Sequence, residues 1–264
     1  MTPASFDLDA RIVLVTGGAG QLGRAYTRHL AGAGARVAVL DLAPPDGPLP
    51  DGAMFVAADV TDRASLEAAR DRIVAEWGAA PHGLVNNAGL DSPPDADASE
   101  NGPFETYPAE SYERVMSVNA TGPMLCSQVF GGAMAEAGRG SIVNIGSTYG
   151  LVSPDQSLYE YRRAGGETFY KPVAYAASKS AVLNLTRYMA TYWGRAGVRV
   201  NTLTLGGVFA GQDPRFLEAY TARVPLGRMA DPQDYFGALH FLLSDASAYM
   251  TGANLVIDGG WTAW

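Results

Sequence analysis

Residues 159–179, YEYRRAGGETFYKPVAYAASK, contain four tyrosines and two lysines, side chains that can pair as an acid–base catalyst. An ammonium beside a phenol favours the phenolate and lowers a pKa that is otherwise about 10. Pro172 fixes its own φ and suits the first turn of a helix, so we predict that a helix begins near Val173. Tyr175 and Lys179 then lie four residues apart on one helix face and form the candidate catalytic pair.

The other tyrosines of this segment are weaker candidates. Tyr170 and Lys171 are neighbours in the sequence, and we expect their side chains to diverge. Tyr159 and Tyr161 lie in a glycine-containing segment for which we expect no helical geometry. The alternative for Tyr175 is an ordinary position on an amphipathic helix, beside a solvated lysine.

A glycine-rich segment indicates a dinucleotide site. Three glycines after the first predicted strand match the spacing G-x-G-x-x-G, namely Gly18, Gly20 and Gly23. Such glycines allow a tight turn and close approach to a pyrophosphate, whose charge the helix N-terminus favours. Asp41 ends the next strand and can accept from ribose hydroxyls, whereas it would repel a 2′-phosphate, so we predict NAD. Arg24 and Arg36 keep NADP open, and an ordinary glycine-rich turn is the alternative.

Short apolar runs alternate with longer helical stretches along most of the chain, which predicts an α/β fold with a doubly wound parallel sheet. The predicted strands are RIVLV, RVAVL, AMFVAA, GLVNN, SIVNI, VRVNTL and NLVID. The predicted helices span residues 21–31, 63–77, 109–131, 173–194 and 231–243. No linker divides the chain, so we predict one domain over residues 1–264, with a Pro/Gly/Asp-rich loop at 90–103 beside the site.

The composition excludes several classes of partner. The chain is 47% hydrophobic and 17% charged, and no apolar run reaches the roughly 18 residues that a membrane span needs. A formal net charge of −8 disfavours nucleic acid and anionic lipid. One cysteine and three scattered histidines predict no metal site. The N-terminus lacks the pattern of a signal peptide, so we expect a cytoplasmic protein that acts on a small molecule.

Several motifs occur in an order that resembles the short-chain dehydrogenases/reductases. They are TGGAGQLG (16–23), AADV (57–60), NNAG (86–89), VNATG (118–122), VNIGS (143–147), YAASK (175–179), VRVN (198–201) and TGANLVIDGG (251–260). The resemblance implies a Rossmann-like single domain, an oxidoreductase and a homo-oligomer, usually a tetramer. It also implies the cofactor contacts Gly17, Gly20, Gln21, Leu22, Gly23, Asp41, Asp59, Val60, Asn87, Ala88, Gly89, Tyr175, Lys179 and Val208.

The resemblance implies a role for each catalytic candidate. Tyr175 exchanges a proton with the substrate oxygen, while Lys179 lowers the pKa of Tyr175 and holds the ribose. Ser147 binds the substrate oxygen, and Asn119 holds a water that relays protons from Lys179. Taken alone, Ser147 could cap a turn and Asn119 could mark a helix distortion.

Three positions depart from the family pattern. Gln21 stands where the single-domain branch has glycine, Leu205 stands where a proline usually precedes Gly206, and Ala210 replaces a threonine. The glycine spacing is instead similar to that of the extended branch. These departures keep open a different class of function, a cofactor-binding regulator or scaffold without turnover.

A further departure is an insertion of about residues 153–171, because 28 positions separate Ser147 from Tyr175 (175 − 147). We predict that it contributes to the substrate site through Tyr161, Arg162 and Arg163, and Thr148, which precedes the insertion, is a further candidate contact. The alternatives are a solvated excursion and a subunit contact. Its polar character favours a sugar, cyclitol or sugar-derived acid, and the segment is similar to family members of surface-sugar and nonulosonate pathways. A 3-oxoacyl or hydrophobic-ketone reductase is the alternative enzyme.

Overall fold

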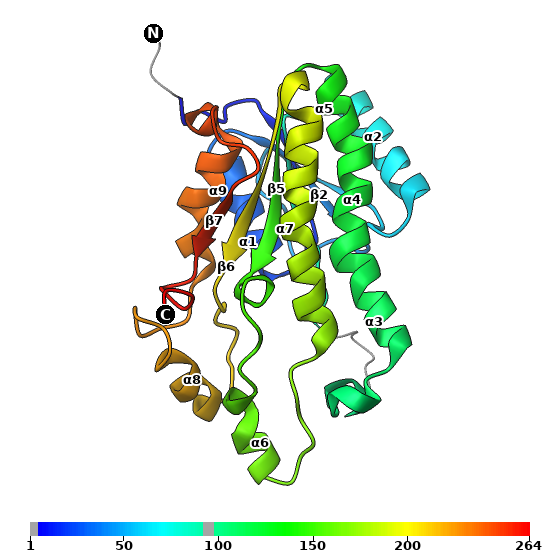
Figure 1. Ribbon diagram of the computed structural model, residues 1–264. Helices are drawn as coiled ribbons and strands as arrows, with labels where there is room; N and C mark the ends of the chain where they lie inside the picture. The colour runs from blue at the N-terminus through cyan, green and yellow to red at the C-terminus, as the bar shows by residue number, and fades with distance from the viewer. Residues whose placement is uncertain (1–4, 92–97) are drawn as a thin grey trace.

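The computed structural model describes residues 5–91 and 98–264, and a parallel sheet of seven strands forms its centre (Figure 1). The strand order is β3-β2-β1-β4-β5-β6-β7, so the order reverses between β1 and β4. The strands are β1 (Ile12–Thr16), β2 (Arg36–Asp41), β3 (Ala53–Ala57), β4 (Gly83–Asn86), β5 (Gly140–Ser147), β6 (Val198–Leu205) and β7 (Asn254–Ile257). The predicted α/β fold class is confirmed, and the seven predicted strands are all present.

The central strands are apolar runs because helices cover both faces of the sheet. All five residues of β1 are buried, as expected for a strand with no solvent-exposed face. The pairing of β5 with β6 runs from Gly140 opposite Val198 to Ser147 opposite Leu205. This register brings the ends of both strands to the same edge of the sheet, where ligands bind in such folds.

Helices form one layer on each face of the sheet (Figure 1). One hydrophobic core joins the sheet to α2 (Arg63–Trp77), to the helix that begins at Ala109 and to α7 (Val173–Trp193). The other core joins it to α1 (Gln21–Gly32) and α9 (Phe236–Leu243). No helix within residues 5–91 and 98–264 combines the length and apolar character needed to cross a bilayer.

The helix predicted at 109–131 is longer and less regular than predicted. It consists of α3 (Ala109–Met116), α4 (Gly122–Cys126) and α5 (Gly132–Glu136), joined by two π-helical segments. These segments are Ser117–Thr121 and Ser127–Gly131. The helix predicted at 231–243 begins with a 3₁₀ turn, Pro232–Tyr235, before α9.

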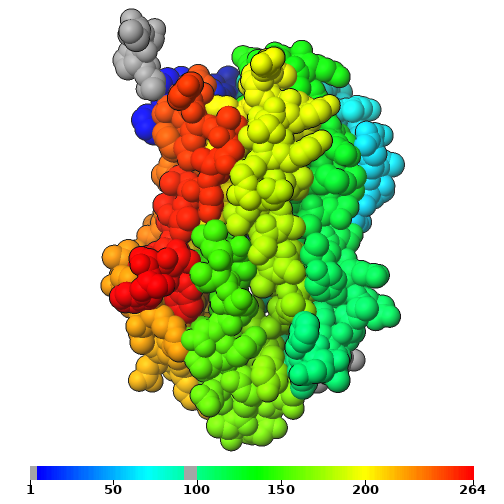
Figure 2. All heavy atoms as spheres, in the orientation of Figure 1, coloured from blue at the N-terminus to red at the C-terminus, as the bar shows by residue number. Residues whose placement is uncertain are grey.

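Two short helices that the sequence analysis missed lie beyond the carboxyl edge of the sheet: α6 (Glu160–Ala164) and α8 (Pro214–Thr221). A small hydrophobic cluster joins the insertion to α8 and the C-terminal segment, and its buried residues are Leu158, Tyr159, Tyr220, Val224, Met229 and Trp261. Figure 2 shows the insertion, in green, beside α8, in orange, at the lower end of the molecule. The insertion therefore packs against a second segment that follows β6.

Candidate active site

Two adjoining cavities lie at the carboxyl edge of the sheet. One has a volume of about 750 Å³ and the other about 720 Å³, sizes typical of sites for small molecules and cofactors. Four residues line both of them: Gln21, Leu22, Asn87 and Gly89. The two cavities therefore meet where β1 and β4 end, at the point where the strand order reverses.

The second cavity is built around the glycine loop. The residues predicted to contact the adenosine and pyrophosphate line it, and they are Gly17, Gly20, Gln21, Leu22, Gly23, Asp41, Asp59, Val60, Asn87, Ala88 and Gly89. Gly17 has a φ of 61°, and a Cβ on Gly23 would lie 2.2 Å from its carbonyl oxygen. Only glycine allows this close packing of loop and helix, and the first residues of α1 line the cavity.

Asp41 is fixed at the wall of this cavity. Its Oδ2 accepts a hydrogen bond from the Ala19 N–H at 2.9 Å, and its Oδ1 accepts from the Leu42 N–H at 2.8 Å. Each carboxylate oxygen can accept a further bond, so both can still serve ribose hydroxyls. Among the described residues, neither Arg24 nor Arg36 lines the cavity.

Asn87 holds the glycine loop against β4. Its Nδ2 donates to the carbonyl oxygens of Thr16 and Gly17 at 2.9 and 3.1 Å. The Thr16 hydroxyl accepts from the N–H groups of Asn87 and Ala88 at 3.0 and 3.1 Å. These contacts join the two strands at the strand-order reversal.

The candidate catalytic pair lies on α7, which begins at Val173 as predicted. Lys179 Nζ is 5.8 Å from the centre of the Tyr175 ring and donates to the Ile145 carbonyl oxygen at 2.9 Å. Tyr175 is partly buried and Lys179 is only 6% exposed. Both residues line the first cavity together with Ser147.

The pKa of Tyr175 lies above its usual value in this structure, and the lowering of that pKa by Lys179 stays a prediction. Burial raises the pKa of Tyr175 to about 12, although a hydrogen bond with Ser147 lowers it and Asp91 raises it further. Burial also lowers the pKa of Lys179 to about 8, against a smaller raising effect of Asp91. Burial is the largest cause of both shifts, because removing a charged group from water costs free energy.

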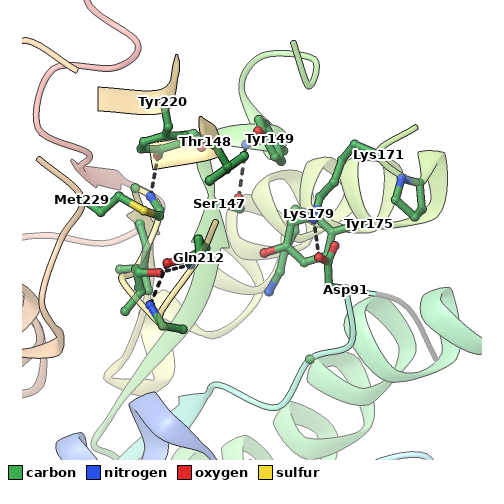
Figure 3. Close-up of a pocket in the computed structure, with 18 of the residues that line it drawn as sticks. Asp91, Ser147, Thr148, Tyr149, Lys171, Tyr175, Lys179, Gln212, Tyr220 and Met229 are labelled. Carbon is green, nitrogen blue, oxygen red and sulfur yellow. Dashed lines mark hydrogen bonds and ion pairs between the residues drawn. The ribbon is translucent and has the colours of Figure 1, made fainter. Parts of the chain in front are cut away.

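The position of Ser147 is compatible with both of its expected roles, capping a turn and binding the substrate oxygen. Its Oγ accepts a hydrogen bond from the Tyr149 N–H at 3.2 Å, which caps the turn after β5 (Figure 3). The same side chain lines the first cavity and interacts with the phenol of Tyr175. The neighbouring Thr148 is buried and lines the cavity as well.

Asn119 lies in the first π-helical segment, so the helix distortion is present. Its amide exchanges two hydrogen bonds of 2.7 Å with the backbone of Leu90, and its Nδ2 also donates to Ser178 Oγ at 3.0 Å. A Cβ on Gly89 would lie 3.4 Å from Asn119 Oδ1 and 3.6 Å from Lys179 Nζ. Glycine at this position therefore lets the amide and the ammonium approach the same backbone segment.

The insertion contributes some, but not all, of its predicted contacts. Tyr161 and Arg162 line the first cavity, whereas Arg163 does not. Arg163 donates to the carbonyl oxygens of Phe169 and Gln156 at 2.8 and 2.7 Å and so holds the insertion together. Arg162 pairs with Glu167.

The expectation that Tyr159 and Tyr161 lie outside helical structure is wrong. A 3₁₀ turn at Gln156–Tyr159 leads into α6, which contains Tyr161. Asp155 caps that turn by accepting from the Ser157 N–H at 2.9 Å, and Tyr159 is buried. Capping and burial offset the cost of the glycines that follow α6.

Lys171 is a site residue that the sequence analysis missed. Its Nζ lies 5.3 Å from the centre of the Tyr175 ring and forms an ion pair with Asp91, and both charged residues line the first cavity. Asp91 belongs to the loop predicted to lie beside the site, of which residues 92–97 fall outside the described residues. Lys171 lies four residues before Tyr175, a spacing that places side chains on one face of a helix. However, α7 begins only after Pro172, so Lys171 is not part of the helix.

The three departures from the family pattern meet at one loop, residues 205–213. Gln21 Nε2 donates to the Phe209 carbonyl oxygen at 2.9 Å, so this side chain joins the glycine loop to the segment after β6. Gln212 accepts from the Ala210 N–H and donates to the Val208 carbonyl oxygen, both at 2.9 Å. Val208 and Ala210 line the first cavity.

Within the described part of the chain, no cluster of side chains could hold a metal ion.

Comparison with known proteins places these features in a family. Residues 17–262 match the family model described as Enoyl-(Acyl carrier protein) reductase. The D-threitol dehydrogenase of Mycolicibacterium smegmatis is 36% identical over 277 residues, which cover 97% of this chain and 95% of that protein.

Solved structures agree with this relation. A short chain dehydrogenase from Leptospira borgpetersenii serovar Hardjo-bovis, with bound NAD+, has a TM-score of 0.86 and 33% identity, with coverage of 99% of this chain and 97% of that one. A gluconate 5-dehydrogenase from Burkholderia cenocepacia, in complex with NADP and tartrate, has a TM-score of 0.82 and 28% identity, with 98% of both chains covered.

Proposed function

This chain belongs to the short-chain dehydrogenase/reductase family, and we propose that it transfers hydride between NAD(H) and a secondary alcohol or ketone of a polyol or sugar. One observation carries the proposal: Tyr175, Lys179 and Ser147 line a cavity that adjoins the glycine-loop cavity. A nicotinamide cofactor supplies the hydride acceptor or donor when it is bound.

The protein's own residues hold the substrate oxygen and move its proton. Ser147 and Tyr175 bind the oxygen of the reacting carbon, and Tyr175 accepts its proton during oxidation or donates one during reduction. Lys179 holds the ribose. Asn119, through Leu90 and Ser178, positions the segment beside Lys179 and provides the relay to solvent.

NAD is the proposed cofactor because of Asp41. Its carboxylate is fixed by two backbone N–H groups at the cavity wall and retains acceptor capacity for the two ribose hydroxyls. A 2′-phosphate would meet this carboxylate as a like charge. The solved relatives include one with NAD+ and one with NADP, so the choice rests on this residue.

The lining of the first cavity supports a hydroxylated substrate. One side is aromatic, with the ring of Tyr159 in contact with those of Phe169 and Phe216. Another side is polar and charged, and its residues are Asp91, Asn101, Arg162, Lys171, Gln212 and Asp213. An apolar acyl chain would desolvate these groups without replacing their hydrogen bonds, which disfavours the acyl-reductase alternative.

The test is a screen of polyols, cyclitols and sugars with NAD+ that follows the absorbance of reduced nicotinamide. We expect turnover of at least one polyol, with a higher kcat/KM than for simple alcohols. We also expect this kcat/KM to exceed that for the reduction of 3-oxoacyl thioesters with NADH. NAD binding without turnover across the panel would instead support the scaffold alternative. Sedimentation of the same preparation measures the proposed tetramer.

A further inference from the structure

A second lysine lies beside the candidate catalytic tyrosine. Lys171 Nζ is 5.3 Å and Lys179 Nζ is 5.8 Å from the centre of the Tyr175 ring. Figure 3 shows Lys171 reaching Asp91 beside Tyr175, at the cavity that also contains Ser147 and Thr148. Lys179 belongs to the family motif, whereas Lys171 belongs to the insertion of this chain.

The insertion fixes the position of Lys171. Gln156 Oε1 accepts from the Lys171 N–H at 2.8 Å, and Gln156 Nε2 donates to the Lys171 carbonyl oxygen at 3.2 Å. Arg163 in turn donates to the Gln156 carbonyl oxygen at 2.7 Å. The Lys171 side chain is 13% exposed and that of Asp91 is 55% exposed, so the lysine is packed at the cavity wall while the carboxylate stays open to solvent.

The pair of Lys171 and Asp91 retains hydrogen-bonding capacity on both partners. An ammonium has three donors, and within residues 5–91 and 98–264 the Lys171 ammonium donates only to Asp91 Oδ2. In the same part of the chain, Asp91 Oδ1 has no hydrogen-bond donor. By contrast, the charges of Arg162 and Asp213 at the same cavity are matched by Glu167 and Arg215.

We propose that Lys171 and Asp91 form a subsite for two neighbouring hydroxyls of an uncharged polyol, next to the hydroxyl that Tyr175 and Ser147 hold. A hydroxyl both donates and accepts, so one can accept from Lys171 while its neighbour donates to Asp91. The pair has no net charge, and Asp91 repels a substrate carboxylate that Lys171 would attract. The subsite thus favours neutral polyols over sugar acids, an inference that rests on the proposed function.

Matched ligands test the Lys171 half of the subsite, because one hydroxyl of a diol lies at Tyr175 and Ser147 and the other can accept from Lys171. Binding of 1,2-cyclohexanediol and cyclohexanol is measured by calorimetry with NADH present, for the wild type and for Lys171→Met. We expect the Kd of the diol to rise about 10- to 100-fold, as for loss of a hydrogen bond to a charged group, and that of cyclohexanol to change less than about threefold. Equal changes for both ligands, or none, would overturn the subsite.

A second variant tests the charge argument without removing the lysine. Asp91→Asn keeps the shape of the side chain, and we expect it to raise the ratio of kcat/KM for gluconate over glucitol by about tenfold, because a like charge is removed. An unchanged ratio would contradict the preference for neutral substrates. Lys171→Gln, which keeps a donor, should retain part of the diol affinity.

The control is Arg70→Met, which removes a cation from the exposed ion pair with Asp71 on α2 and should change none of these values. The binding arm also separates the two proposals. If diol affinity depends on Lys171 but no alcohol is turned over, the proposed function fails and the subsite stands. If alcohols are turned over and Lys171→Met affects diol and cyclohexanol equally, the subsite fails and the proposed function stands.

Discussion

Each end of the sheet has a large cavity with charged residues in its lining, and the two ends differ in what those residues bind. The cavity at the carboxyl edge has a volume of about 750 Å³, and one at the amino edge has about 810 Å³. The amino-edge cavity is also lined by charged residues, among them Arg11, Arg139, Arg199 and Asp245. Neither volume nor the presence of charge therefore identifies the candidate active site.

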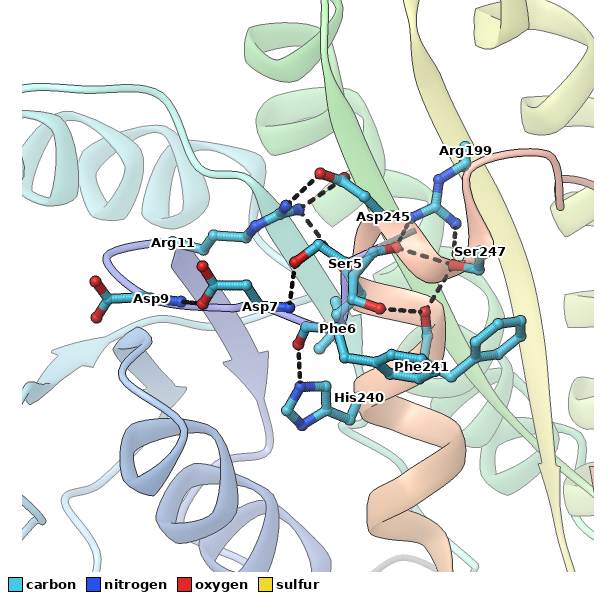
Figure 4. A network of polar contacts seen from close by, with 12 residues as sticks. Ser5, Phe6, Asp7, Asp9, Arg11, Arg199, His240, Phe241, Asp245 and Ser247 are labelled. Carbon is cyan, nitrogen blue, oxygen red and sulfur yellow. Dashed lines mark hydrogen bonds and ion pairs between the residues drawn. The ribbon is translucent and has the colours of Figure 1, made fainter. Parts of the chain in front are cut away.

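At the amino edge, two of the arginines have partners within the protein (Figure 4). Arg11 donates to both oxygens of Asp245, at 3.1 and 2.6 Å. Arg199 donates to the carbonyl oxygens of Leu242 and Ser244, at 2.9 and 3.0 Å, and to Ser247 Oγ at 2.8 Å. These contacts fasten the end of α9 to β1 and β6.

At the carboxyl edge, side chains from several elements converge with capacity left for a ligand. Ser147 follows β5, Tyr175 comes from α7, and Lys171 comes from the insertion. Asp41 and Asp91 each retain acceptor capacity toward a cavity. The two edges differ in their partners: Arg11 and Arg199 bind groups that join α9 to the sheet, whereas the groups at the carboxyl edge meet beside the cavity of the glycine loop.

The largest effect that would test this comparison is at Tyr175. Tyr175→Phe should reduce kcat by roughly 10²–10⁴-fold, because it removes a positioned acid–base group, and leave NAD affinity within about threefold. Steady-state kinetics and a fluorescence titration of NADH measure both quantities. Tyr170→Phe is the control; if it abolished activity while Tyr175→Phe did not, the catalytic assignment would be wrong.

A smaller effect is expected for cofactor choice. Asp41→Ala should narrow the ratio of kcat/KM for NAD over NADP by roughly 10- to 100-fold, because a like charge near the 2′-phosphate is removed. Asp59→Ala, in the same cavity, is the matched control and should affect both cofactors alike. A wild-type preference for NADP would contradict the proposed role of Asp41.

The amino edge should respond in stability and not in activity. Arg199→Met removes the hydrogen bonds from the guanidinium to the Leu242 and Ser244 carbonyl oxygens and to Ser247 Oγ, which should lower the free energy of unfolding by about 1–3 kcal/mol. Urea unfolding measures this change, and kcat/KM of the folded fraction should stay within about twofold of the wild type. A large loss of kcat/KM without loss of stability would mean that the amino-edge cavity is also functional.

The fold was predictable because buried parallel strands are continuous apolar runs, and helices between them have crossover length. The start of α7 was predictable for a local reason, the fixed φ of Pro172. A similar signal marks α8: Asp213 accepts from the Arg215 N–H at 2.8 Å, and Pro214 occupies the first helical position. That pair of residues could have revealed the helix.

The features that were missed depend on contacts between distant segments. Lys171 and Asp91 are 80 positions apart in the sequence, so no local pattern predicts their contact. The sequence also does not show which way the side chain of a residue just before a helix points. The net direction of the Tyr175 pKa depends on burial by several elements, which the spacing to Lys179 does not reveal. Local rules thus predicted the elements and the motif residues, whereas the insertion's contribution to the cavity wall required tertiary structure.

The smallest effect concerns the buried ammonium of Lys179. Its pKa falls from 10.5 to about 8, so between these pH values the unfolded chain binds more protons than the folded one. Stability from this group should therefore rise with pH above about 8, by at most about 1.4 kcal/mol per pH unit. Above about pH 10 the raised pKa of Tyr175 opposes this, because the folded phenol then keeps its proton longer.

Urea unfolding at pH 7.0, 8.0 and 9.5 measures the difference in free energy of unfolding between the wild type and Lys179→Met. The contributions of other titrating groups cancel in this difference. We expect the wild type to gain stability relative to Lys179→Met between pH 8.0 and 9.5, and little between pH 7.0 and 8.0. Arg70→Met, which removes an exposed charge that does not titrate in this range, should show a flat difference. A flat difference for Lys179→Met as well would mean that burial does not destabilise the ammonium of Lys179, and the two edges of the sheet would then not differ in this respect.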